Sequence, residues 1–170
     1  MAAEPTRRLA SATTALATVA ATISASVIAA GTAAAAPSGP KIVPFASVLR
    51  HCDQTAANFD PVRGVATGYA LLSSTQRDVV AEVHLQSAHP GTRYLVTLIQ
   101  VPRPTSATCE SGDPGVTGGV LDTDAGGNAV ATLRGPIQSG ATGAWVDVEI
   151  PSDHSQSPIE YYTSDFVGPI

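Results

Sequence analysis

The amino-acid sequence predicts an all-β protein: a single antiparallel β-sandwich of about seven strands, preceded by an N-terminal signal peptide. Three observations predict this class. From residue 60 onward, short β-branched and apolar runs alternate with clusters of Gly, Pro, Asp and Asn at roughly ten-residue spacing. Several runs alternate apolar and polar residues with the period of two that a half-buried strand requires. Beyond the N-terminal leader, no window carries the apolar stripe of an amphipathic helix.

Residues 1–35 are predicted to be a signal peptide. Arg7 and Arg8 form a positive start, an uncharged run follows from Leu9 to Gly31, and the segment ends in small residues of the kind that signal peptidase accepts. The uncharged run is about as long as a membrane-spanning helix, but its many Ser and Thr residues make it weakly apolar. We therefore expect cleavage, a secreted or cell-envelope location, and no stable membrane insertion afterwards.

The mature chain divides into a lead-in, residues 36–59, and a sandwich domain, residues 60–170. Within the lead-in, "IVPF" (42–45) or "ASVLRHC" (46–52) is expected to pair as a first edge strand. Seven further strands are expected at 64–72, 78–86, 92–101, 118–123, 128–133, 143–150 and 160–167.

The alternation predicts which side of each strand faces the core. In 78–86 the odd-numbered residues from Val79 to Leu85 are apolar, so they share the inner face. In 143–150 the even-numbered residues are expected inside, which leaves Trp145, Asp147 and Glu149 on the outer face. The run "YLVTLIQV" (94–101) is apolar on both faces, so we expect a central strand whose back is covered.

The two cysteines, Cys52 and Cys109, are expected to form a disulfide, because an even pair in an exported chain usually does. A cross-link closing a loop of this length stabilises a fold by roughly 4 kcal/mol in the chain-entropy model. Cys109 lies within the longest irregular segment, residues 101–119, where Pro102 and Pro104 remove ladder donors. That long segment is either a functional loop or a bridged insertion.

A short stretch, "HPGTRYLVTL" (89–98), resembles the tyrosine corner of immunoglobulin-like and fibronectin type III sandwiches. In those folds a Tyr at the start of a strand, here Tyr94, bonds back to the backbone of the preceding crossover. The resemblance implies an Ig-like architecture rather than a function. It departs from the fibronectin pattern in that several strands follow the Tyr strand. More loosely, the chain is similar to small exported β-domain proteins of actinobacteria.

The stretch "LDTDAGGNAVATL" (121–133) has two interpretations. Asp122, Asp124 and Asn128 alternate as calcium ligands can, but the segment lacks the fifth ligand and the closing carboxylate of an EF-type loop. A hairpin turn needs only Asp, Asn and Gly at these positions. We favour the turn and keep a cation site as the weaker alternative; no cofactor is expected.

The charge composition disfavours two classes of binding partner. The formal net charge is −5, with no basic cluster, so nucleic acid and anionic membrane surfaces are poor partners. We expect a non-catalytic binding or interaction module for an extracellular protein or carbohydrate. Its surface is expected in the 101–119 loop, at Arg103, and around Trp145, Tyr161 and Tyr162. These aromatic residues either share an exposed face or plug the ends of the sandwich.

The alternative is a small secreted hydrolase acting on an envelope or polymer substrate. Asp147 and Glu149 project from one face of a predicted strand, and a carboxylate pair can act as acid and base in glycoside hydrolysis. If the pair lies in a concave site, this alternative stands; if it lies on a flat, wet face, it does not.

Overall fold

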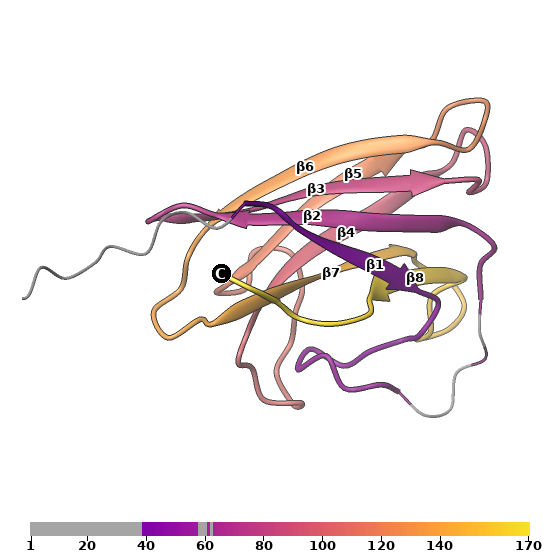
Figure 1. Ribbon diagram of the computed structural model, residues 1–170. Coiled ribbons are helices and arrows are strands. Elements are labelled where there is room, and N and C mark those ends of the chain that lie inside the picture. The colour runs from indigo at the N-terminus through magenta and orange to yellow at the C-terminus, as the bar shows by residue number, and fades with distance from the viewer. Residues whose placement is uncertain (1–38, 58–60, 62) are drawn as a thin grey trace, which may run out of the picture. The chain divides into compact units, whose positions relative to one another are not determined.

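The computed structural model describes residues 39–57, 61 and 63–170, and within these it contains nine β-strands and no helix (Figure 1). This confirms the predicted all-β class. The predicted signal peptide lies outside the described residues. Among those that are described, no helix is long and apolar enough to cross a membrane. The strands are β1 (Lys41–Ala46), β2 (Thr67–Ser74), β3 (Asp78–Gln86), β4 (Arg93–Val101), β5 (Val116–Asp122), β6 (Ala129–Pro136), β7 (Gly143–Ile150), β8 (Glu160–Ser164) and β9 (Gly168–Pro169).

The strands form two antiparallel layers that approach a closed barrel. The first layer has the order β1-β2-β3-β6, and the second has the order β5-β4-β7-β8-β1, with β9 pairing the start of β7. At the opposite corner, β5 and β6 pack together after the turn that joins them. Figure 1 shows β2, β3 and β6 as one layer and β7 and β8 across from them.

Strand β1 joins the two layers, and this corrects the predicted edge strand. Its first part, Lys41 to Pro44, pairs with β2, while Phe45 and Ala46 pair with β8. The predicted "IVPF" segment is therefore a strand, but it lies between two neighbours rather than at an edge. Val43 is fully buried in the core. The domain thus begins within the lead-in, near Lys41.

The core lies between the layers and follows the predicted alternation. All four odd-numbered residues from Val79 to Leu85 are buried, as are Ala144, Val146 and Val148 on β7. These side chains meet across the sandwich in one apolar cluster. Packing of the two inner faces therefore accounts for most of the fold.

The predicted tyrosine corner is present. The Tyr94 hydroxyl, at the start of β4, accepts the backbone N–H of His89 at 3.3 Å. The strand order nevertheless departs from the immunoglobulin constant fold, in which the second and third strands belong to different sheets. Here β2 and β3 form a hairpin within one sheet. The corner is shared with Ig-like sandwiches, and the connectivity is different.

Candidate functional site

The predicted exposed aromatic face does not form, because its three aromatic residues are buried. Trp145 is only 1% exposed: it packs with Ile99 and Val116 in a second apolar cluster on the outer face of β4 and β7. Cys109 also packs against this cluster, so the disulfide-tethered loop covers the indole. Alternation predicted the outer face correctly, but a distant loop shields that face from water.

Tyr161 and Tyr162 are also buried, although they point to opposite sides of β8. The Tyr162 ring lies in the main core, and its hydroxyl accepts the N–H of Ala66 at 2.9 Å. On the other side of the strand, the Tyr161 hydroxyl donates to the carbonyl of Pro61. Neither ring is available to stack on a ligand.

Arg103, the other predicted binding residue, holds its own loop together. Its guanidinium donates to the carbonyl oxygens of Pro114 at 2.6 Å and Thr108 at 2.7 Å. These two bonds bridge the loop of residues 102–115, hereafter the disulfide loop, which the Cys52–Cys109 bond ties to the N-terminal segment. The predicted disulfide is confirmed, and Arg103 is a structural residue of that loop.

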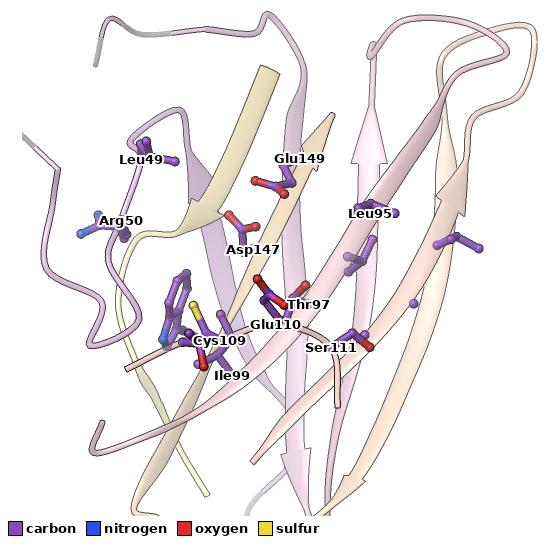
Figure 2. A pocket seen from close by; sticks show the side chains of 16 residues that line it. Leu49, Arg50, Leu95, Thr97, Ile99, Cys109, Glu110, Ser111, Asp147 and Glu149 are labelled. Atoms are coloured by element: carbon purple, nitrogen blue, oxygen red, sulfur yellow. The ribbon is translucent and has the colours of Figure 1, made fainter. Parts of the chain in front are cut away.

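The outer face of β4, β5 and β7 carries a cavity of about 650 Å³, hereafter the acidic cavity. Its floor is formed by these three strands. Leu49 and Arg50 form one side, and residues 108–111 of the disulfide loop form another. Figure 2 shows Asp147 and Glu149 projecting into it from β7. The volume lies within the range of small-molecule sites in proteins.

Asp147 and Glu149 are the chemically distinctive groups of the acidic cavity. Two residues apart on one strand face, they lie about 7 Å apart along the backbone. Neither carboxyl has a hydrogen-bond or ion-pair partner among the described residues. Asp147 keeps limited accessible surface, and its burial, together with the nearby Glu149 charge, holds its pKa well above the usual value. Burial also raises the pKa of Glu149.

The arginine that borders the cavity is already engaged elsewhere. Arg50 donates to the Thr163 hydroxyl at 3.1 Å and to the Gln54 carbonyl at 3.1 Å, and it forms an ion pair with Asp165 at 3.6 Å. A third carboxylate, exposed Glu110, lines the cavity from the disulfide loop. The cavity therefore has an excess of negative charge.

The segment 121–133 contains the predicted turn, between Asp124 and Asn128, but it is not the predicted hairpin, because β5 pairs with β4 and β6 pairs with β3. The Asp124 carboxylate accepts the N–H groups of Gly126 and Asn128, both at 2.8 Å, and these bonds lower its pKa. Gly127 has a φ of 75°, and a Cβ there would lie 2.1 Å from the Ala88 carbonyl oxygen, so glycine is required. Asp122 instead binds Arg93 on β4 at 2.7 Å, which lowers the pKa of Asp122. Both carboxylates thus already bind protein groups, which favours the turn over the weaker cation-site alternative.

A second polar cluster was not anticipated from the sequence. Buried Glu160 accepts hydrogen bonds from the hydroxyls of Tyr94, at 3.1 Å, and Tyr162. Its other oxygen lies 3.1 Å from Nε2 of the exposed His89. Burial raises the pKa of Tyr94 to about 12, so the phenol stays protonated and keeps donating at neutral pH. The cluster ties β8 to the tyrosine corner and is explained by that structural role.

Comparisons with known proteins add no relative: no family model, curated protein or solved structure matches this chain.

The sequence indicated part of the acidic cavity. It predicted that Asp147 and Glu149 lie together on the outer face of a strand, and that a disulfide tethers the loop at Cys109. It did not indicate Leu49, because nothing in the local pattern tells which irregular segment packs beside β7. The one available signal was the cysteine pair, which brings residues near Cys52 to those near Cys109.

Proposed function

We propose that this protein is an exported, non-catalytic binding module whose ligand site is the acidic cavity. The observation that carries the proposal is the unpaired acid pair, Asp147 and Glu149, inside a concave site of ligand size. A protein gains nothing in stability from two crowded, unpaired carboxyls of like charge. A ligand that supplies the missing cation would offset this cost in folding stability, as is typical of a binding site. The proposed ligand-binding surface is therefore the acidic cavity and not the aromatic face expected from the sequence.

The proposal includes export of the protein and a relation to small exported Ig-like proteins. The Cys52–Cys109 disulfide is compatible with an oxidising, extracellular location. The leader-like composition of residues 1–35 supports export through a cleaved signal peptide. The Tyr94 contact supports a relation to small exported Ig-like proteins, whereas the β2–β3 hairpin within one sheet speaks for a distinct branch.

The site can be tested with the protein's own reporter, because Trp145 is the only tryptophan and lines the acidic cavity. A library of small extracellular ligands (sugars, amines and short peptides) is screened by indole fluorescence and by two-dimensional NMR. We expect hits that shift the Trp145 indole N–H together with the amides of Leu95 and Thr97. If hits shift only the outer face of β2 and β3, the acidic cavity is not the ligand site.

The alternative of a small hydrolase is favoured by one observation: both carboxyls line a concave site rather than a flat face. Burial and the nearby Glu149 shift the pKa of Asp147 upward, which is the direction that a general acid requires. However, glycosidase carboxyls flank the scissile bond, whereas this pair projects side by side from one strand face. Incubation with envelope polysaccharides separates the two functions. A hydrolase releases product and loses turnover in Glu149→Gln, while a binding module releases none.

A further inference from the structure

We infer that the acidic cavity takes a small organic cation, an ammonium or guanidinium on an apolar body. This inference rests on the proposed function and narrows its ligand class. Two separate features of the cavity support it: the unpaired acid pair and an apolar strip beside it.

The first feature is the lack of any cation for the acid pair. The charged groups bordering the cavity are Arg50, Glu110, Asp147 and Glu149. Arg50 is held by Thr163, Gln54 and Asp165, which leaves three carboxylates facing the space. A ligand cation placed between Asp147 and Glu149 would offset both their desolvation and their mutual repulsion. An anion would be repelled, and a neutral sugar would leave the charge uncompensated.

The second feature is apolar surface next to the acid pair. Leu95 on β4 and Val120 on β5 face each other across the strands, and they are 40% and 50% exposed. Both line the cavity, with Ile99 further along β4. β4 lies between β5 and β7, so this strip runs beside the carboxylates. A ligand that fills the cavity can therefore place an apolar group on the strip and a cation on β7.

Trp145 also lines the cavity, where it serves as a reporter of binding. Its indole N–H has no hydrogen-bond acceptor among the described residues, but the nitrogen is shielded from solvent, so a ligand oxygen in the cavity does not reach it. The cavity volume restricts this ligand to a small molecule rather than a folded partner.

The test uses two probes that differ in one group. Phenylalaninol carries an ammonium, a hydroxyl and a benzyl group, and in 3-phenylpropane-1,2-diol a hydroxyl replaces the ammonium. Each is titrated into the disulfide-bonded protein while Trp145 fluorescence and the indole N–H resonance are followed. We expect phenylalaninol to bind at least tenfold more tightly than the diol. A third arm, acetyl-lysine methylamide, shows whether the same cation is accepted from a peptide.

Matched variants test the acid pair directly. Asp147→Asn and Glu149→Gln combined should reduce the preference for phenylalaninol to less than threefold. Glu82→Gln and Asp153→Asn remove the same charges away from the cavity and should leave it unchanged. Equal affinity for both probes, or an unchanged preference in the acid-pair double variant, overturns the cation inference while the binding site itself stands. If no probe or library member perturbs Trp145, the proposed function fails as well.

Discussion

At the scale of single residues, the two polar clusters of this protein have opposite energetics. In the tyrosine corner both carboxylate oxygens of buried Glu160 have partners: one accepts hydrogen bonds from two tyrosine hydroxyls, and the other lies beside a histidine nitrogen. In the acidic cavity, by contrast, Asp147 and Glu149 have none among the described residues. A satisfied buried network stabilises a fold, whereas an unsatisfied one costs stability and is typical of a functional site. Two substitutions can measure this difference.

Tyr94→Phe is expected to destabilise the protein by about 1–3 kcal/mol. The change removes one donor to buried Glu160 and the acceptor of the His89 N–H, without leaving a cavity. Urea unfolding followed by Trp145 fluorescence gives the free energy. Tyr69→Phe is the control, because Tyr69 stacks on His84 and its hydroxyl makes no hydrogen bond within the described residues. Equal losses in the two variants would argue against the network.

Asp147→Asn is expected to stabilise the protein at neutral pH, by about 1–3 kcal/mol. The folded pKa of Asp147 lies above its unfolded value, so ionisation costs the folded state more than the unfolded one. That cost is absent below the unfolded pKa, near 4, and it grows as the pH rises through the folded pKa. The variant's advantage should therefore increase from pH 4 to pH 8.

The measurement for Asp147→Asn is the urea midpoint across this pH range, with exposed Asp153→Asn as the matched control. A constant difference between the variant and the native protein, or a loss of stability at pH 8, would show that the Asp147 carboxyl is not unpaired in solution.

At the scale of elements, the disulfide loop decides what the outer face of β7 becomes. The Cys52–Cys109 bond spans 57 residues and places Cys109 against the Trp145 cluster. Beside it, Thr105 donates to the Asp53 carboxylate, a second link between the same two segments. The loop therefore buries one end of the outer face and forms a side of the acidic cavity at the other.

The double substitution Cys52→Ser and Cys109→Ser is expected to cost roughly 4 kcal/mol. Because Cys109 covers the indole, Trp145 emission should also shift to longer wavelength in the folded variant. Differential scanning calorimetry and emission spectra measure the two effects. Native protein treated with reductant should reproduce both. A folded variant with unchanged emission would mean that the loop stays in place without its tether.

The sequence was informative about elements and less so about what covers them. Alternation in 78–86 located both the strand and its inner face, because a sheet with one buried face requires that period. The same logic put Trp145 on the outer face but left open whether its ring is exposed or covered. Coverage of that face depends on a loop some forty residues earlier in the chain, and such long-range packing has no local pattern. The burial of Tyr161 was left open for the same reason.

At the scale of the whole molecule, the fold depends on one strand that belongs to both layers. β1 gives its first four residues to β2 and its last two to β8, and it contributes Val43 to the core. At the other corner β5 and β6 are joined by a tight turn and pack together. Without β1, the layers would lose the hydrogen-bonded connection between β2 and β8. β2 and β8 would then be unpaired edge strands, and the core between the layers would be exposed to water beside them.

Truncation distinguishes this architecture from a domain that starts at residue 60. A chain beginning at Gly39 is expected to unfold cooperatively with the same midpoint as the mature protein. A chain beginning at Ser47 keeps Cys52 and the disulfide, but it loses all β1 pairings and the buried Val43 side chain. The losses approach the whole net stability of a small domain, so this chain should lack dispersed amide resonances and a cooperative transition. A folded chain beginning at Ser47 would show that β1 is an accessory strand and that β2 and β8 can border the core without it.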